Sequence, residues 1–240
     1  LNFFVENICA VTGFMAPTID VALPLGISFY TFQIMSYIID VYRKKYPAGR
    51  NLIEVAAYIS MFPQLIAGPI VTFDEVQPRL RERKISPANI ENGLLLFVVG
   101  LVYKVMLANQ IAALWNDVMV AGVMGINTAT AWLGAWGYSM QIYFDFLGYS
   151  LMAIGMGYML GFRFPKNFSN PYCAVSVTDF WRRWHITLGR WFREYVYIPL
   201  GGNKKGKFRL VINIFIVWFL TGLWLSLIHI SEPTRQEAIS

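Results

Sequence analysis

The sequence predicts an all-α integral membrane protein, a multi-helix bundle that includes a re-entrant segment and an amphipathic helix at the membrane interface. Hydrophobic residues make up 56% of the 240-residue chain and charged residues only 14%, whereas soluble domains carry about 25% charged residues. Several apolar segments approach the roughly 20 residues that a membrane-crossing helix needs. Between two of them lies a stretch rich in arginine, tryptophan and histidine, which is too charged to cross a bilayer.

Three segments have the composition of membrane spans. They are residues 21–42, residues 93–114, and residues 209–224, where a further span starts. Lys104 falls in the middle of the second segment, where a charge is costly and normally faces a cavity or a partner. Asp145 is a second intramembrane charge, and a Lys104–Asp145 pair is one arrangement that the sequence allows.

Residues 128–162 form an apolar run that is too long for a single span. We expect this run to be broken around Asp145 and Gly148. Gly157 and Gly161 stand four positions apart, a spacing that favours close contact between membrane helices. Helix packing is a sufficient explanation for that glycine pair.

The basic residues predict a topology, because cytoplasmic loops collect Lys and Arg. Those of the first two loops are Arg43, Lys44, Lys45, Arg50, Arg79, Arg81, Arg83 and Lys84. If both loops are cytoplasmic, residues 52–71, which contain Pro63 and Pro69, cannot cross fully and must form a re-entrant segment or a bent hairpin. We place the loop near 115–127, which lacks Lys and Arg, outside, and the basic residues 163–208 on the cytoplasmic side.

The stretch "DFWRRWHITLGRWFREYVYIPLGG" predicts an amphipathic helix over about 179–196, with Thr178 as its N-cap. An apolar stripe follows from the spacing of five side chains: Phe180, Trp184, Leu188, Trp191 and Tyr195. His185 falls on an aromatic flank, where desolvation favours a neutral imidazole. A neutral histidine suits a general base, but a packed structural histidine gives the same pattern.

Other chemistry finds little support. Cys9 and Cys173 are far apart and have no metal-ligand spacing, so we expect ordinary packing residues, no disulfide framework and no metal site. The loop "LGGNKKGK" lacks the phosphate-loop pattern. The net charge of +6 reflects cytoplasmic loops rather than nucleic-acid binding.

Four blocks resemble the membrane-bound O-acyltransferase (MBOAT) family, and most of all its alginate O-acetyltransferase branch. They read "PLGISFYTFQIMSYIIDVYR", "MFPQLIAGPIV", "YFDFLGYSLMAIGMGYMLGFRFPKNFSNPY" and "SVTDFWRRWHITLGRWFREYVYIPLGGNKKG". The branch that moves D-alanine toward teichoic acids shares a weaker version. The resemblance implies a multi-pass protein of the bacterial inner membrane, with helices around a central tunnel. Members are longer than this chain, so residues 1–224 are expected to be a central fragment of the transmembrane domain.

The resemblance also implies acyl transfer to a hydroxyl of an extracytoplasmic polysaccharide. No bound cofactor is expected; acetyl-CoA or another acyl thioester would be the co-substrate. Expected partners are the lipid bilayer, the polysaccharide and other exopolysaccharide-modification proteins, with no nucleic acid. His185 matches one of two histidines noted in the family and is the candidate catalytic residue. Side chains expected to support the substrate or the tunnel are Trp181, Arg182, Arg183, Trp184 and Asp145.

The family's second histidine follows "TGLW" and is usually taken as the essential base, but here Leu225 occupies its place. The string "SLIHISEPTR" resembles translated sequencing-adapter DNA. We therefore expect residues 225–240 to be a non-natural tail, His229 to have no role, and the chain as given to be inactive. A genuine variant tail is the alternative.

Two other classes of function stay open. A polysaccharide or lipid transporter would also contain broken helices and intramembrane charges. A non-catalytic scaffold for an acetylation complex would tolerate the absence of the second histidine. Detection of acetyl ester on polysaccharide only in the presence of the intact gene separates an enzyme from a transporter.

Overall fold

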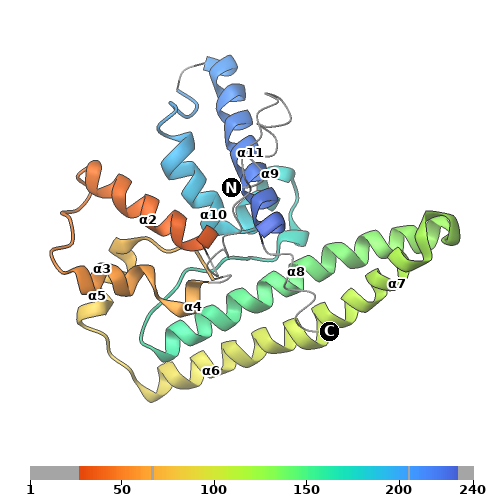
Figure 1. Cartoon of the computed structure of the whole chain (residues 1–240), viewed down its shortest axis with the longest axis horizontal. Coiled ribbons are helices and arrows are strands. Elements are labelled where there is room, and N and C mark those ends of the chain that lie inside the picture. Colours follow the sequence, from red (N-terminus) through yellow and green to blue (C-terminus); the bar gives the residue numbers. More distant parts are fainter. Residues whose placement is uncertain (1–26, 66–67, 205, 232–240) are drawn as a thin grey trace, which may run out of the picture.

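A computed structural model describes residues 27–65, 68–204 and 206–231, and all regular secondary structure in these ranges is helical (Figure 1). The predicted all-α class is therefore confirmed. The α-helices are α2 (Ile27–Tyr42), α3 (Leu52–Ile59), α4 (Phe62–Leu65), α5 (Phe73–Arg81), α6 (Pro87–Val102), α7 (Asn109–Gly125), α8 (Thr128–Met159), α9 (Val177–Arg183), α10 (Ile186–Phe192) and α11 (Gly206–Ser231). Shorter 3₁₀ or π-helical turns are Tyr103–Ala108, Pro171–Cys173 and Arg193–Tyr197.

Two stretches of the described chain are long and apolar enough to cross a membrane, Pro87–Gly122 and Gly206–Leu225. Only 11% and 6% of their most apolar windows are buried inside the protein. The core helix of a soluble protein would be mostly buried, so this exposure favours contact with lipid or with further membrane helices. Of the predicted span at 21–42, α2 accounts for residues 27–42, and residues 21–26 lie outside the described ranges.

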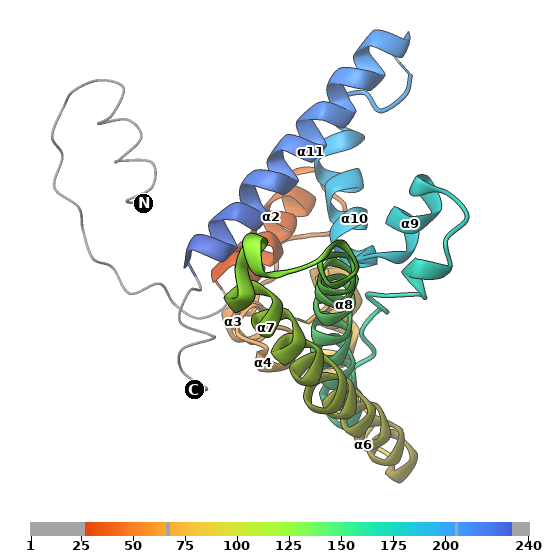
Figure 2. The same cartoon turned by 90° about the vertical axis from the view of Figure 1, so that its right-hand side faces the viewer.

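The longest feature is an arm in which α6, the π-helical turn and α7 run antiparallel to α8 (Figures 1 and 2). Helix α8 is continuous over 32 residues. The predicted break around Asp145 and Gly148 is therefore wrong. The predicted outer loop near 115–127 is wrong for residues 115–121, which are helical. Helix α7 kinks at Gly122, whose backbone is not helical (φ 66°, ψ 169°), so the turn toward α8 lies within residues 122–127.

Glycines explain how α6 and α8 come so close. A Cβ atom on Gly155 of α8 would lie 2.5 Å from the carbonyl oxygen of Gly93, and one on Gly148 would lie 2.7 Å from that of Gly100. Both distances are below any van der Waals contact, so only glycine allows the two backbones to meet here. Gly148 is thus a packing position inside a continuous helix, and this packing is why the helix does not break there.

The GxxxG pair predicted for close helix contact has other roles. A Cβ on Gly157 would meet the ring of Phe164 at 2.5 Å, so this glycine makes room for the chain that returns after α8. Gly161 lies beyond the helix with φ +82°, a left-handed conformation that glycine adopts without strain. The prediction of helix–helix contact at this pair is wrong, and the close contacts with α6 lie earlier on α8, at Gly148 and Gly155.

The described parts of the hairpin at residues 52–71 hold two short helices in place of a full span, as expected for a re-entrant segment or a bent hairpin. Helix α3 has eight residues, about 12 Å at 1.5 Å per residue, which is too short to cross a hydrocarbon core of about 30 Å. The chain then returns past Tyr58, whose hydroxyl donates to the carbonyl of Val71 at 2.8 Å. The flanking basic loops lie at the same end of the molecule, where Lys45 pairs with Asp74 at 3.2 Å (Figure 1).

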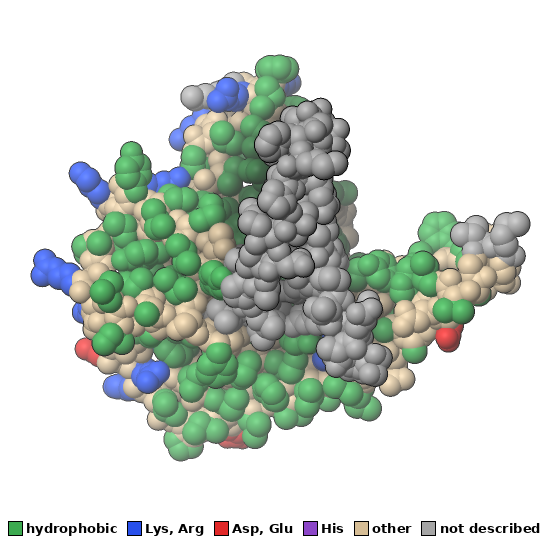
Figure 3. Space-filling model, viewed as in Figure 1, with side chains coloured by type: hydrophobic (Ala, Val, Ile, Leu, Met, Phe, Trp, Pro, Cys, Tyr) green, Lys and Arg blue, Asp and Glu red, His purple; other side chains and the backbone are tan. Residues whose placement is uncertain are grey.

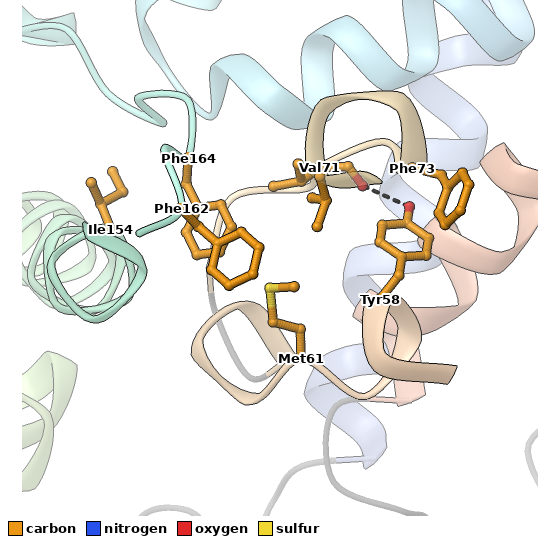
Figure 4. Packing of buried hydrophobic residues seen from close by; sticks show 8 residues of the cluster. Tyr58, Met61, Val71, Phe73, Ile154, Phe162 and Phe164 are labelled. Atoms are coloured by element: carbon orange, nitrogen blue, oxygen red, sulfur yellow. Dashed lines mark hydrogen bonds between the residues drawn. The ribbon is translucent and has the colours of Figure 1, made fainter. Parts of the chain in front are cut away.

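A hydrophobic cluster joins this hairpin to the end of α8 (Figure 4). Tyr58 and Phe73 are fully buried in it, and Ile154 reaches it from α8. Phe162 and Phe164 enter from the segment after the arm and lie between Ile154 and the hairpin in Figure 4. The cluster fixes the start of the 162–169 segment, which leads to the functional site.

The visible face of the molecule is dominated by hydrophobic side chains, which cover much of the arm (Figure 3). Lys and Arg side chains gather at the end opposite the arm tip and at the top of the view (Figure 3). Exposed apolar residues on α6 include Leu94, Leu95, Val98 and Leu101. This distribution is the one expected of a surface that meets an apolar environment.

Candidate functional site

The stretch predicted as one amphipathic helix is two helices with a break between them. Ser176, not Thr178, is the N-cap of α9, and its side chain accepts from the backbone N–H of Asp179. The cap is Ser176 because its Oγ lies within 3.1 Å of that N–H, three residues into the turn. Helix α9 ends at Arg183, and α10 begins at Ile186.

The break is made by Trp184 and His185. Trp184 is extended, and His185 adopts a left-handed backbone conformation with φ 43° and ψ 55°. Such a conformation is uncommon for a residue other than glycine and is often found at functional positions. As a result the predicted apolar stripe is divided, with Leu188, Trp191 and Tyr195 buried together while Trp184 packs elsewhere.

His185 is enclosed by the break. Its side chain is 5% exposed, and its ring meets the ring of Phe146 from α8 edge to face, with centroids 4.7 Å apart. Its Nδ1 lies 3.0 Å from Oδ1 of Asn167. Burial lowers the pKa of His185 from 6.5 to about 3, because an apolar site disfavours the charged imidazolium. The neutral state predicted from the sequence agrees with this environment, but the predicted aromatic flank on the same helix does not, because the ring that covers His185 is that of Phe146 from α8.

Asn167 is the hub of the local hydrogen bonds. Its Oδ1 also accepts from the hydroxyl of Thr187 at 2.9 Å and from the backbone N–H of Thr187 at 3.4 Å. The main chain on both sides of the break is tied down as well, since Ile186 N–H donates to Asn167 O at 2.9 Å and Ser169 N–H donates to Arg183 O at 3.0 Å. His185, with its left-handed backbone, therefore lies in a segment that backbone hydrogen bonds hold on both sides.

The aromatic residues of the predicted site lie on two sides of this break. Trp184 stacks on Phe180 and packs edge to face on Phe168, with centroids 5.6 and 5.1 Å away. Trp181 is 42% exposed and meets Trp218 of α11 edge to face at 4.7 Å. Trp184 thus shares Phe168 with the His185 neighbourhood, whereas Trp181 connects α9 to the membrane-length helix α11.

The predicted charged residues are not gathered around His185. Arg182 is exposed. Arg183 forms an ion pair with Asp179 one turn earlier on α9, with Nε 3.0 Å from Oδ1. Asp145 lies in the arm and pairs there with Lys104, as the sequence allowed. A role for these three residues in supporting the substrate or the tunnel stays a prediction.

Lys104 reaches Asp145 from the π-helical turn, Tyr103–Ala108. The same ammonium lies 4.9 Å from the ring centroid of Tyr149, one turn beyond Asp145. A π-helical turn widens the helix locally and often marks a functional position. The pair sits next to Phe146, the residue through which α8 touches His185.

Arg190 anchors α10 to α5, the helix that follows the hairpin. Its guanidinium donates to both carboxylate oxygens of Glu75, at 2.7 and 3.1 Å. The backbone N–H of Ile70 donates to the hydroxyl of Thr187 at 3.1 Å. Segments about 115 residues apart in the chain are thereby joined beside His185, and Arg190 has a structural partner rather than a free charge.

Sequence reasoning missed three residues of this site: Phe146, Asn167 and Thr187. Each is an ordinary residue in a chain of this composition, and their spacing from His185 follows no motif of metal or nucleophile chemistry. The only available signal was their position inside the blocks that carry the family resemblance. Their common feature is contact with one buried imidazole, which only the folded chain displays.

Together the features define a class: an all-helical membrane-type protein with a buried, neutral histidine at a helix break. Residues 48–224 match the family model described as MBOAT, membrane-bound O-acyltransferase family. The chain belongs to this family, as its motifs predicted.

Curated relatives agree. The chain is 47% identical over 227 residues to a probable alginate O-acetylase AlgI of Pseudomonas putida, covering 93% of this chain and 46% of the relative. It is 36% identical to a peptidoglycan O-acetyltransferase of Helicobacter pylori, over 93% and 47% of the two chains. A teichoic acid D-alanyltransferase of Bacillus subtilis is 30% identical, over 83% and 53%. The chain spans about half the length of these relatives.

Proposed function

We propose that this chain is the central part of a membrane-bound O-acyltransferase that moves an acetyl group to a hydroxyl of an extracytoplasmic polysaccharide such as alginate. The observation that carries the proposal is that His185 is buried and neutral. It lies at the break between α9 and α10, inside the segment that matches the family. A neutral imidazole is the state that a general base requires. Similarity to an alginate O-acetylase supports the acetyl group and the polysaccharide class.

In the proposed reaction the acceptor hydroxyl attacks the carbonyl carbon of an acyl thioester such as acetyl-CoA. A new C–O bond forms as the hydroxyl proton passes to a histidine, and the C–S bond breaks as the tetrahedral intermediate collapses. The imidazolium then returns the proton to the departing thiolate. A site shielded from bulk water suppresses hydrolysis of the donor, and the low exposure of His185 is consistent with such shielding.

The proposed setting is the bacterial inner membrane, with several crossings. Two membrane-length helices and the apolar surface support this setting. Other exopolysaccharide-modification proteins are the proposed partners. The hairpin at 52–71 is proposed to be re-entrant, and α9 and α10 to lie at the cytoplasmic interface with Trp181, Arg182 and Arg183 supporting the substrate path.

A second part of the proposal concerns residue 225. The family match ends at Trp224, and Leu225 stands where the resemblance implies a second histidine. We propose that the natural parent has histidine there, that residues 225–240 are foreign to it, and that the chain as given is inactive. Sequencing of the source gene tests this directly, since an uninterrupted natural frame that encodes "LSLIHISEPTR" would refute it.

The activity itself is tested in the intact parent gene. We expect membranes that contain it to place acetyl ester on polysaccharide, and His185→Gln to lower the rate by on the order of 10²-fold or more, as expected for loss of a general base. Lys207→Gln, a change at an exposed residue, is the matched control and should retain full turnover. Unchanged turnover of a folded His185→Gln protein would return His185 to a packing role.

D-alanyl transfer toward teichoic acid is the second candidate, favoured by the 30% identity to a D-alanyltransferase. The same membranes would then transfer labelled D-alanine rather than labelled acetate. Transfer of neither group, together with movement of polysaccharide across the membrane, would favour a transporter. Acetylation that persists without His185 and residue 225 would favour a scaffold.

A further inference from the structure

A buried chain of hydrogen bonds leads from the hairpin to the imidazole. The backbone N–H of Ile70 donates to Oγ1 of Thr187 at 3.1 Å, Thr187 Oγ1 lies 2.9 Å from Asn167 Oδ1, and that oxygen lies 3.0 Å from His185 Nδ1. Thr187 and Asn167 are each 1% exposed and His185 is 5% exposed. Water therefore does not compete for these bonds, and each polar atom depends on its protein partner.

The direction of these hydrogen bonds follows from the first donor, the backbone N–H of Ile70. A backbone N–H can only donate, so Thr187 Oγ1 accepts from Ile70 and keeps its own hydrogen for Asn167. The backbone N–H of Thr187 points to the same Asn167 oxygen at 3.4 Å. Two donors thus face this atom, which identifies it as the amide oxygen rather than the amide nitrogen.

The reversed amide is less favourable. It would set the Asn167 NH₂ group against the backbone N–H of Thr187 and leave the Thr187 hydroxyl hydrogen without its acceptor. The amide nitrogen is buried without a partner among the described residues, so reversal would leave a buried oxygen unpaired in its place. With an oxygen facing the imidazole, Nδ1 must carry the hydrogen that forms the 3.0 Å contact.

We propose that Asn167 is a positioning residue that holds His185 as the Nδ1–H tautomer, and that Thr187 fixes the orientation of the Asn167 amide. The lone pair is then on Nε2, so Nε2 is the atom of His185 that can accept a proton in the proposed reaction. The inference rests on the proposed function of His185 as a base. The contact between α10 and Ile70 also has a role in this arrangement: the backbone N–H of Ile70 sets the direction in which every hydrogen bond of the series donates.

The tautomer is measurable without any enzymatic activity. The chain has two histidines, so His229→Gln leaves His185 as the sole imidazole. The protein is produced with ¹⁵N-labelled histidine and reconstituted in lipid, and the nitrogen chemical shifts report which ring nitrogen carries hydrogen. We expect a protonated Nδ1 and an unprotonated Nε2 at neutral pH. A protonated Nε2, or an even mixture of both tautomers, overturns the proposal.

Variants test the two positioning side chains. Asn167→Asp keeps an acceptor opposite Nδ1 and should keep the Nδ1–H signal, whereas Asn167→Leu should give a mixture. Thr187→Val should loosen the preference and Thr187→Ser should retain it. Asn213→Leu removes an equally buried amide that bonds Gly202 instead, so it controls for loss of packing and should leave the spectrum unchanged. A mixture in Asn213→Leu as well would contradict a specific role for Asn167.

In the intact parent protein, the activities of the same variants distinguish a positioning role of Asn167 from a purely structural role. Asn167→Leu should lower kcat by on the order of 10²-fold with KM nearly unchanged, because a wrong tautomer removes the base without removing the binding site. Asn167→Asp should retain more activity than Asn167→Leu. A purely structural asparagine gives the opposite order, since a buried carboxylate disturbs packing more than leucine. If the tautomer is as proposed but His185→Gln leaves turnover intact, the proposed function fails while the assignment of the tautomer stands.

Discussion

At the scale of single residues, His185 combines three properties that reinforce one another. Its left-handed backbone stops α9 and starts α10, its side chain is buried against Phe146, and its Nδ1 contacts a fixed amide. Strained backbone persists only where the surroundings determine it. Here two backbone hydrogen bonds, from Ile186 and Ser169, hold the segment on either side.

The buried imidazole predicts a dependence of stability on pH. Its pKa is about 3 in the folded protein and about 6.5 in an unfolded chain. The unfolded chain therefore binds the proton first, and stability is lost as the pH falls from 6.5 toward 3, by about 1.4 kcal/mol per pH unit for this group.

The measurement compares thermal unfolding in detergent of the wild-type protein and His185→Gln between about pH 7 and pH 4.5, where most carboxylates remain charged. On acidification the melting temperature of the wild-type protein should fall more than that of His185→Gln. Parallel curves for the two proteins would show that His185 does not titrate in this window.

At the scale of the elements, the arm depends on glycine contacts. At Gly155 the nearest atoms to an added Cβ are backbone atoms of Gly93 and Phe97, at 2.5 and 2.8 Å. Backbone cannot rotate away as a side chain can, so the helices must separate to admit even one methyl group. Because Phe146 and Asp145 lie on the same helix, the spacing of α6 and α8 also governs the position of the site.

Gly155→Ala should therefore destabilise the protein by about 1–3 kcal/mol, the usual cost of overpacking. Gly222→Ala is the matched control, since an added Cβ there meets no described atom within 4 Å. Melting followed by circular dichroism in detergent should show a lower midpoint for the first variant only. Equal midpoints would mean that the two helices separate freely.

The Lys104–Asp145 pair joins the two halves of the same arm. Its side chains are 23% and 39% exposed, in a segment of membrane length. Removal of one charge strands the other in an apolar setting, and we expect a cost of about 1–3 kcal/mol for this partly exposed pair.

A double-mutant cycle tests the pairing. Asp145→Asn and Lys104→Met should each lower the melting temperature, and the double variant should be more stable than the sum of the two losses predicts. Additive losses would show that the two charges do not stabilise one another.

At the scale of the whole molecule, the arm separates two ends of different charge. The loops after α2 and α5 carry the basic clusters and lie together at one end, held by Lys45–Asp74 and by Arg81–Glu54 at 2.8 Å. The turn between α7 and α8 lies at the opposite end of the arm (Figure 1). With the positive-inside rule, this arrangement predicts that the basic end is cytoplasmic.

Cysteine labelling in sealed, right-side-out vesicles tests the orientation. In a background with Cys9→Ser and Cys173→Ser, a membrane-impermeant maleimide should label Asn127→Cys from outside. Arg50→Cys and Lys84→Cys should react only after the vesicles are opened. All three positions are exposed, so access is limited by the membrane alone. Labelling of all three from one side would refute a crossing by the arm.

The sequence by itself determined the membrane class, the apolar segments, the bent hairpin at 52–71 and the family. These properties depend on composition, on the lengths of apolar runs and on local blocks of residues, all of which can be read along the chain. His185 was also singled out from the sequence, but the aromatic ring that buries it belongs to α8 and not to its own helix.

Only the tertiary structure decided the continuity of α8, the break at His185 and the partners of that histidine. Gly148 looked like a helix breaker because its contact with Gly100 belongs to another helix. The apolar stripe predicted one helix over 179–196, but Asn167 and Ile70 hold the chain in a conformation that a stripe cannot reveal. The physical reason is the same in each case: contacts between distant segments outweigh local preference, and a single chain read in order does not show which segments meet.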